Sequence, residues 1–464
     1  MVVKFFAFLA CVALPFLAFS QFQMSGRVMD AADQNPLPGA NITVQGTFKG
    51  AVSGSTGYFS LSGLAAGTHV LQVSFMGFET REVQVQIPTN EAFTIKLDRM
   101  ATLTGEVVVV GLRADNRTPA TFTNVSEEMI AAKNLGQDIP YLLNLTPSLV
   151  VTSDAGAGVG YTWMNIRGSD NTRVNITLNG IPLNDAESHG VWWVNKPDLA
   201  SSLDNVQVQR GVGLSTHGAG AFGATISMTT LGLRDHAYAE LENSFGSFNT
   251  MKNTAQFGTG LMNEKWSFDG RLSRIVSDGF IDRAASDLKS FYLSGGYFGR
   301  NTILRAVVLS GSETTYQAWN GVPGHMLQTN RTYNPSGRFT DSQEVVHYYE
   351  NETDNYQQDH YQLHLSHAFN TETTGNLSLF YTRGRGYFEQ FRDNERFSRY
   401  NLPNLEIGNQ TITRTDLIRR RWLDNHYAGA VYSFLHSPVQ ALSPTLGGGY
   451  KSYWGRHFGE IIRS

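Results

Sequence analysis

The chain has 464 residues, of which 41% are apolar, 16% charged and 12% aromatic, and it contains 46 glycines. This length exceeds one ordinary domain and predicts roughly three. Low charge with many aromatics and glycines is typical of a membrane β-barrel rather than a cytosolic enzyme, because barrel strands alternate apolar with small polar residues. The formal net charge of −4 argues against a nucleic-acid partner.

Residues 1–20 have the pattern of a secretory signal peptide. Lys4 precedes an apolar run over 5–19, and the small-x-small sequence Ala-Phe-Ser ends at Ser20. The run is too short to span a bilayer comfortably, so it predicts export. Cleavage after Ser20 would remove Cys11, the one cysteine of the chain, which excludes disulfide and thiolate chemistry from the function.

Residues 22–98 contain short alternating runs separated by turn signals. Even spacing without helical periodicity predicts a small β-sandwich. The Pro-Leu-Pro-Gly-Ala segment at 36–40 and the Gly-Tyr-Phe-Ser-Leu segment at 57–61 resemble the carboxypeptidase-regulatory-like family, a transthyretin-like sandwich. No His-x-x-Glu zinc spacing accompanies them, so the resemblance implies a periplasmic spacer domain and no peptidase activity.

Residues 103–111 read Leu-Thr-Gly-Glu-Val-Val-Val-Val-Gly. A valine run by itself most often indicates a buried strand. This run lies between one predicted domain and a polar stretch, where a core strand would have no sheet, and it resembles a TonB box. Such a segment adds as an edge strand to TonB through backbone hydrogen bonds. The implied coupling residues are Glu106, Val107, Val108, Val109 and Val110.

Residues 115–231 combine two short predicted helices with a glycine-punctuated sheet. Ser126 is placed to cap one helix, and Pro140 is tolerated near the start of the second. Residues 174–178 alternate as a half-buried strand, and the Asn-Gly pair at 179–180 predicts a hairpin. Two further strands are expected downstream, within 203–211 and 218–230.

The order of motifs in this domain resembles the plug of TonB-dependent outer-membrane receptors. The motifs are Asn-x-Arg-Gly at 165–168, the Asn-Gly hairpin, Val-x-Val-x-Arg-Gly at 206–211 and Gly-Ala-Gly-Ala-Phe-Gly-Ala-Thr-Ile at 218–226. The family often has a second glycine where this chain has Phe222. The resemblance implies a gated transporter whose barrel, export signal and coupling segment the rest of the chain must supply.

Two plug arginines carry a further implication of this resemblance. Arg167 and Arg210 match the arginines that pair with barrel-wall carboxylates in the family, and Glu242 on the first barrel strand is the candidate partner. The alternative is that both are ordinary solvated arginines at strand ends.

Residues 236–464 alternate apolar and polar residues over long segments, which predicts membrane strands with one face toward lipid. A soluble two-sheet sandwich would alternate in the same way, and the plug favours the barrel. Connections are short at 298–302 and long at 311–359 and 386–414, as expected for tight periplasmic turns and long external loops. The resemblance is to the 22-stranded type, so we expect only the N-terminal part of that barrel.

The predicted fold class is therefore an all-β-dominated membrane protein with an N-terminal sandwich, an α+β plug and a partial antiparallel barrel. Ligand-binding candidates are aromatic, basic or histidine side chains on predicted loops. They are His189, Trp192 and Trp193 in a plug loop, Trp319 and His325 in the first long external loop, and Arg392, Arg396 and Arg399 in the second. Guanidinium groups and flat rings together suit an anionic, partly aromatic chelate.

The sequence predicts a TonB-dependent active transporter of the outer membrane of a Gram-negative bacterium, importing an iron chelate. Expected partners are TonB, outer-membrane lipid and a small iron-chelate ligand, with no cofactor, no resident metal and no catalytic residues. No Gly-x-Ser-x-Gly elbow or Walker loop supports an enzyme. Heme uptake is disfavoured because Phe-Arg-Ala-Pro is absent. The alternatives are a glycan importer working with a surface lipoprotein, and a surface adhesin or passive porin.

Overall fold

The computed structural model describes most of the chain from residue 22 to residue 463. The exceptions are residues 32, 48, 76, 77, 79, 90–92, 99–112, 115–119, 214–220, 235, 264, 300, 371 and 438–443. The predicted signal peptide at 1–20 and the TonB-box-like segment at 103–111 lie outside the described residues. The chain divides into two compact units, Met1–Thr104 and Gly105–Ser464.

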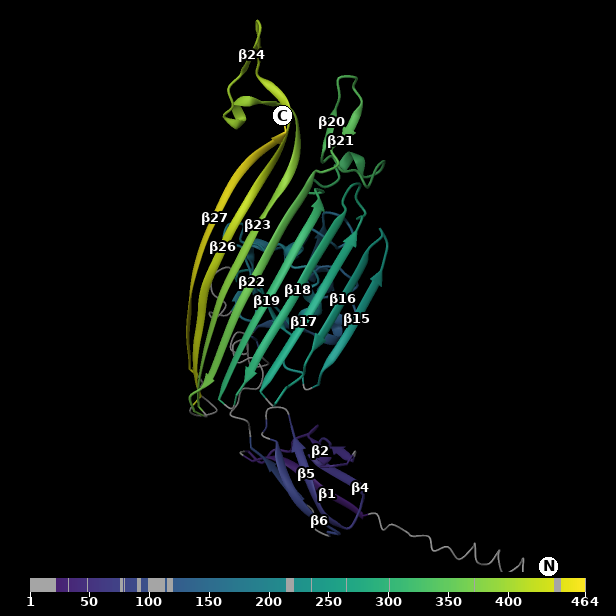
Figure 1. Ribbon diagram of the computed structural model, residues 1–464, viewed down its shortest axis with the longest axis vertical. Coiled ribbons are helices and arrows are strands. Elements are labelled where there is room, and N and C mark those ends of the chain that lie inside the picture. Colours follow the sequence, from purple (N-terminus) through teal and green to yellow (C-terminus); the bar gives the residue numbers. More distant parts are fainter. Residues whose placement is uncertain are drawn as a thin grey trace, which may run out of the picture. The chain divides into compact units, whose positions relative to one another are not determined.

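The first unit contains two small sheets that enclose an apolar core. Its strands are β1 (Phe22–Asp30), β2 (Asn41–Val44), β3 (Gly50–Val52), β4 (Tyr58–Leu64), β5 (Gly67–Ser74), β6 (Arg81–Ile87) and β7 (Phe93–Leu97). One sheet has the order β4-β1-β7 and the other the order β3-β2-β5-β6 (Figure 1). Val28, Ile42 and Leu71 are fully buried between them, which confirms the expected N-terminal β domain.

Gly57 shows why the Gly-Tyr-Phe motif begins with glycine. Its φ angle is +72°, a conformation that side chains rarely adopt. A Cβ at this position would also lie 2.4 Å from the carbonyl oxygen of Val28. The turn into β4 therefore requires glycine for both its backbone angle and its close approach to β1.

The second unit begins with the plug, a five-stranded sheet flanked by two short helices. The elements are β8 (Thr121–Ser126), α3 (Glu127–Ala131), α4 (Ile139–Leu142), β9 (Leu149–Ser153), β10 (Thr162–Ile166), β11 (Val174–Leu178), β12 (Ile181–Pro182), β13 (Leu203–Arg210) and β14 (Ala224–Thr230). The sheet order is β12-β11-β14-β13-β8, with β11 parallel to β14. Ser126 caps α3 by accepting a hydrogen bond from the backbone nitrogen of Met129, as predicted.

Strand β11 is more deeply buried than its alternating sequence predicted. All five of its residues are buried, including Asn175 and Thr177. The polar face of the plug sheet is covered in part by the chain at Arg113 and Ala114. The Ala114 backbone nitrogen donates to Gln207 Oε1 at 2.8 Å, and Arg113 Nη2 donates to the carbonyl of Ser227 at 3.0 Å. The alternating residues of β11 therefore form one apolar and one polar face, and both faces are buried. The prediction of a half-buried strand was wrong.

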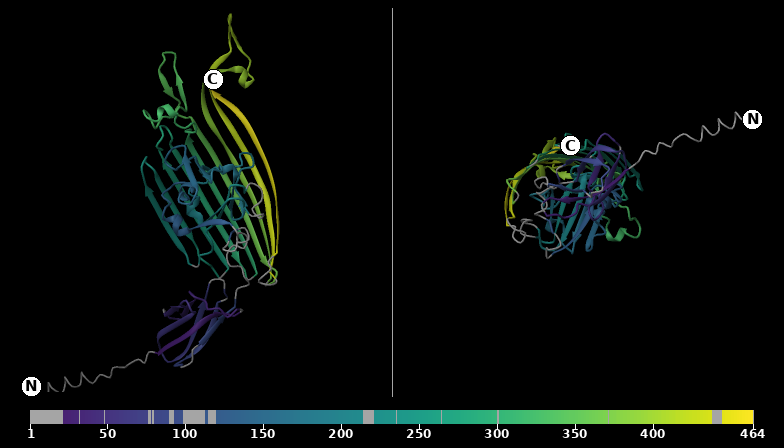
Figure 2. Two further views of the ribbon diagram at one scale, coloured as in Figure 1. Left: turned by 180° about the vertical axis from the view of Figure 1, so that it is seen from behind. Right: turned by 90° about the horizontal axis from the view of Figure 1, so that it is seen from below.

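A nine-stranded antiparallel sheet forms the barrel wall of this unit (Figure 1). Its strands, in sheet order, are β15 (Tyr238–Phe245), β16 (Met251–Gly258), β17 (Trp266–Ser277), β18 (Ser286–Phe298), β19 (Thr302–Tyr316), β22 (Thr353–Ala368), β23 (Thr373–Arg396), β26 (Arg414–His436) and β27 (Thr445–Arg463). One face curves around the plug, as Figure 2 shows. Among the described residues, no helix is long and apolar enough to cross a membrane.

The two faces of the wall have opposite polarity. Leu241 is 80% exposed and Leu272 is 59% exposed on the face away from the plug, whereas the inward Thr254, Gln256 and Ser273 are buried. This arrangement confirms the predicted membrane barrel, in which apolar residues face lipid and polar residues face the interior.

The second predicted external loop is largely a strand. Pairing between β23 and β26 continues as far as Arg396 opposite Arg414. Phe388, Phe391 and Arg392 therefore lie on β23, and only residues 397–413 connect the two strands, through β24 (Leu405–Ile407) and β25 (Gln410–Ile412). The boundary at 386 was wrong because the glycines there are accommodated within the strand pairing.

Candidate ligand-binding site

A plug loop presents Trp192 to the interior of the barrel. Asp185 Oδ1 organises the loop by accepting hydrogen bonds from the backbone nitrogens of Glu187 at 3.0 Å and Ser188 at 2.7 Å. Ser188 Oγ in turn accepts from Trp192 Nε1 at 3.1 Å. The Asp185 side chain thus replaces regular secondary structure as the hydrogen-bond acceptor for this turn, and Ser188 of the turn orients the indole ring of Trp192.

Rings from the plug and from the wall meet at this point. Trp192 lies 5.0 Å from Trp163 and 5.9 Å from Tyr161 between ring centroids, both with edge-on geometry. Trp319, which follows β19, lies 5.5 Å from both Tyr161 and Phe388 of β23. Edge-to-face pairs of this kind hold aromatic clusters together, so the cluster has a defined shape.

The aromatic cluster borders a cavity of about 670 Å³ between the plug and the barrel wall. This volume is in the range of small-molecule sites. The charged residues that line the cavity are mainly acidic: Asp154, Asp185, Glu187, Glu313 and Asp354, with one arginine, Arg421. Glu187 Oε2 lies 2.8 Å from His457 Nε2. The arrangement offers apolar ring surface together with several hydrogen-bond acceptors.

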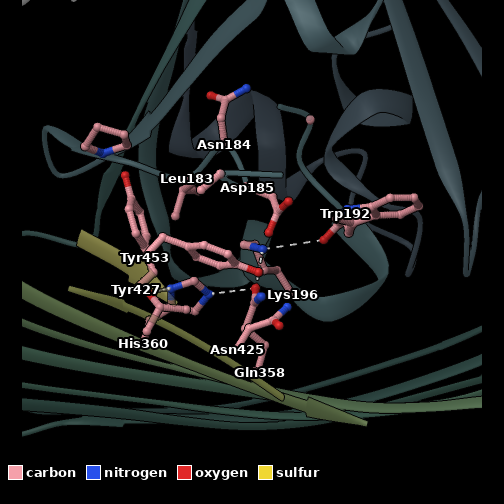
Figure 3. Close-up of a pocket in the computed structure, with 15 residues that line it drawn as sticks. Leu183, Asn184, Asp185, Trp192, Lys196, Gln358, His360, Asn425, Tyr427 and Tyr453 are labelled. Atoms are coloured by element: carbon pink, nitrogen blue, oxygen red, sulfur yellow. Dashed lines mark hydrogen bonds between the residues drawn. The ribbon is translucent and has the colours of Figure 1, made fainter. Parts of the chain in front are cut away.

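A smaller pocket of about 40 Å³ adjoins the first, since Trp192, Asp185 and Gln358 border both. Figure 3 shows Lys196 at its centre, where Nζ donates to Gln358 Oε1 at 2.7 Å. Burial lowers the pKa of the Lys196 ammonium to about 8, although Asp185 acts in the opposite direction. The plug lysine thus connects the acidic loop to the barrel wall.

The structure separates the five plug and first-loop candidates. Trp192 and Trp319 line the cavity. Trp193 is 2% exposed and belongs to the plug core. His189 has a φ angle of +59° and closes the acidic turn through its backbone nitrogen, and His325 is exposed on the short helix Gly324–Met326. Neither histidine is among the residues that line the cavity.

The three arginine candidates do not form one cationic loop. Arg392 is partly buried on β23 and donates to Gln390 Oε1 at 2.8 Å. Arg396 ends that strand, and Arg399 pairs with Glu395 at 3.0 Å. None of the three is among the residues that line the cavity.

The plug is held to the wall by an acid on the plug rather than by the two predicted arginines. Asp198 is buried between Lys252 of β16 and Arg271 of β17, at 3.4 Å and 3.1 Å. Glu242 pairs with the same lysine at 2.9 Å, so the expected pairing of Glu242 with a plug arginine was wrong. The sign of the contact is reversed because the wall places Lys252 and Arg271 opposite Asp198.

The predicted arginines have other partners. Arg167 Nη2 donates to Thr121 Oγ1 at 3.2 Å, and Arg210 Nη1 donates to the carbonyl of Pro147 at 3.4 Å. Both contacts lie within the plug. Sequence reasoning missed Asp198, although Lys252 and Arg271 occupy inward positions whose neighbours are otherwise small and polar, and this pattern was the available signal.

The described residues contain no group of three or more His, Cys, Asp or Glu side chains that could hold a metal ion.

Two family comparisons cover adjacent segments of the chain. Residues 24–109 match the CarboxypepD_reg-like domain family, and residues 114–225 match the TonB-dependent Receptor Plug Domain family. A TonB-dependent receptor of Formosa agariphila is 28% identical over 151 residues, which are 32% of this chain and 14% of that relative. Another from the same organism is 33% identical over 88 residues, 19% of this chain and 8% of the relative. The matches thus span a small part of these curated relatives.

Solved structures share the fold of the second unit. P. aeruginosa FpvA bound to heterologous pyoverdines has a TM-score of 0.52 at 14% identity, over 75% of this chain and 44% of that chain. The ferric-catecholate import receptor Fiu from E. coli K12 has a TM-score of 0.54 at 15% identity, over 75% and 51%. The unliganded ferric citrate transporter FecA has a TM-score of 0.53 at 13% identity, over 74% and 49%. The chain spans about half the length of these receptors, and the likeness establishes a plug within a barrel.

Proposed function

Because the chain is a TonB-dependent receptor of the Gram-negative outer membrane, we propose that the intact protein actively imports a small iron chelate with energy from TonB. The observation that carries this proposal is the cavity of about 670 Å³ between plug and wall, bordered by Trp192 and Trp319. In this proposal the plug is the gate. A ligand in the cavity touches side chains of the plug, such as Trp192, so that movement of the plug changes the ligand's contacts.

Energy coupling is assigned to residues 103–111. Four valines in a row favour extended backbone, and strand addition needs only a free edge with backbone donors and acceptors. TonB is therefore the proposed partner of Val107 to Val110. Plug movement would then open the barrel beside the ligand.

The iron-chelate assignment rests on shape and on fold. The cavity accepts a ligand with flat or apolar surface, because the side chains of Trp192, Trp319 and Phe388 line it. The neighbouring structures named above are receptors for ferric complexes by their own descriptions.

Glycan import with a surface lipoprotein is the second candidate. Sugar rings also pack on tryptophan, and carboxylates such as Asp185 accept hydrogen bonds from hydroxyl groups. A surface adhesin or passive porin would not need the plug contacts described above.

The test uses the complete gene in its own host. A deletion strain, the complemented strain and a strain lacking TonB are compared for growth and radioiron uptake on a panel of iron chelates, and for growth on oligosaccharides. We expect uptake of one chelate to require both the receptor and TonB. Oligosaccharide growth that depends on the receptor would favour the glycan importer, and uptake without TonB would contradict active transport.

A further inference from the structure

The charged side chains that line the cavity are mainly acidic, whereas an anionic ligand requires basic ones. Five carboxylates and one guanidinium line it. Two of these acids have basic neighbours: Glu187 lies beside His457, and Asp185 lies near Lys196. The other three acids, Asp154, Glu313 and Asp354, lie around Tyr161.

Three acids surround Tyr161. Asp354 accepts a hydrogen bond from the Tyr161 hydroxyl, Asp154 accepts from Trp163 Nε1 at 3.0 Å, and Glu313 accepts from Thr315 Oγ1 at 3.2 Å. Among the described residues, none of these acids forms an ion pair with a lysine or arginine. Glu313 is only 2% exposed and Asp354 only 9%. Ionised carboxylates at such burial are costly without a positive partner.

Burial and the nearby Glu313, Asp354 and Asp154 raise the pKa of the Tyr161 hydroxyl well above its ordinary value. Tyr161 therefore remains a neutral donor and cannot neutralise the acids around it. Among the described residues, no lysine or arginine pairs with the three acids on this side of the cavity.

Two amide oxygens give independent support. Asn195 is 7% exposed, and its Oδ1 atom is buried without a hydrogen-bond partner among the described residues. Asn425 Oδ1 on β26 is also buried without such a partner. Both residues line the same cavity. Buried acceptors are normally paired, so a ligand that brings N–H donors completes them.

The rings supply the third element. The aromatic cluster lies beside the acids, because Tyr161 contacts the rings of Trp163, Trp192 and Trp319. Ring faces attract cations. From the acids, the unpaired acceptors and the rings together, we propose that the cavity selects ligands with a positively charged, N–H-bearing group, an ammonium or guanidinium, and rejects anionic chelates. This proposal rests on the site of the proposed function and replaces the expectation of an anionic chelate.

Binding to the purified full-length receptor tests the charge preference directly. Ferrioxamine B carries a free ammonium, its N-acetyl derivative is uncharged at that end, and its N-succinyl derivative carries a carboxylate. The three probes share one iron-chelating body. We expect ferrioxamine B to bind about tenfold more tightly than the acetyl form, the succinyl form to bind weakest, and the preference to shrink with added salt.

The Glu313→Gln and Asp354→Asn double variant removes both charges while keeping side-chain shape. We expect it to weaken ferrioxamine B binding by about tenfold and to change binding of the acetyl form by less than about threefold. Asp287→Asn is the matched control, because Asp287 is an acid of the same wall that pairs with Arg274 outside the cavity. Tighter binding of the succinyl form, or a double variant with unchanged preference, would overturn the proposal.

A second titration covers the case in which the receptor recognises none of these chelates. Benzylammonium is compared with benzyl alcohol while tryptophan fluorescence is followed. A change with the amine alone, lost in the double variant, supports the cationic site. Equal responses, or none up to tens of millimolar, contradict it. Since neither experiment involves transport, a failed charge preference leaves the proposed import untouched, and a failed uptake assay leaves the charge preference untouched.

Discussion

Asp198 of the plug and Arg271 of the barrel wall form a buried ion pair, with Asp198 Oδ2 at 3.1 Å from Arg271 Nη1. Asp198 adopts the left-handed conformation at φ +51°, which aspartate tolerates better than most residues. Hydroxyl groups of Thr254 and Ser273 donate to the same carboxylate oxygen at 2.7 Å each. This fully buried, well-bonded acid therefore attaches the plug to β16 and β17 of the wall.

The first prediction concerns the stability of this attachment. Asp198→Asn keeps the shape but leaves Arg271 buried without its counter-charge and leaves Lys252 paired with Glu242 alone. Removing one partner of a buried ion pair costs about 3–5 kcal/mol, so we expect the plug to become protease-sensitive at a lower urea concentration. Glu242→Gln is the control, because Glu242 is 42% exposed beside the same lysine and should matter little. Equal effects of the two variants would contradict the assignment.

The second prediction concerns pH. Burial opposes ionisation of Asp198, but Arg271, Lys252 and hydrogen bonds from the hydroxyl groups of Thr254 and Ser201 outweigh it and lower the pKa from 3.8 to about 2. A lowered pKa in the folded state stabilises the plug fully above the ordinary pKa, and this stabilisation is lost as pH falls. We expect protease sensitivity of the plug to rise between about pH 4 and about pH 2. The Asp198→Asn variant should lack this component, and an unchanged pH profile would argue against it.

The third prediction concerns energy coupling. Val108→Pro removes a backbone donor from the strand proposed to add to TonB. Uptake by the full-length receptor should fall to background, while ligand binding to the outer face of purified receptor should not change. Val108→Thr keeps the donor and the β-branched side chain, so it serves as the control. Normal uptake by the proline variant would rule out this coupling segment.

The fourth prediction separates two candidates from the same external loop. Trp319→Ala should weaken ligand binding by about tenfold or more, since truncating a central aromatic residue of a binding site commonly costs over 2 kcal/mol. His325→Ala should leave affinity unchanged, because His325 is exposed and does not line the cavity. Calorimetric titration of both variants with the transported ligand checks this. A larger effect of the histidine change would place the ligand outside the cavity.

The fifth prediction concerns the arginine candidates. Changing Arg392, Arg396 and Arg399 together to Ser tests whether they capture the ligand. None of them lines the cavity, and the exposed charges of Arg396 and Arg399 contribute little, so we expect equilibrium affinity to change by less than about threefold. A loss of tenfold or more with a reduced salt dependence would restore the arginine-based hypothesis.

Local patterns in the sequence determined the elements. The cap at Ser126, the Asn-Gly hairpin and the alternation of wall residues such as Leu241 and Leu272 depend on neighbours a few positions away. The ordered glycine and arginine motifs at 165–168, 206–211 and 218–226 likewise identify the plug from sequence alone. These features follow from backbone geometry and from the two faces of a strand, which the chain encodes locally.

Only the tertiary structure decided which side chains meet. Tyr161 and Asp354 are hydrogen-bonded although 193 positions separate them, and Asp198 reaches Arg271 only because the plug sits against particular inward positions of β16 and β17. The extent of β23, and with it the place of Arg392, depended on pairing with β26. Contacts of this kind are set by strand register and by the fit of one domain against another, and a one-residue shift would exchange the inward and outward faces.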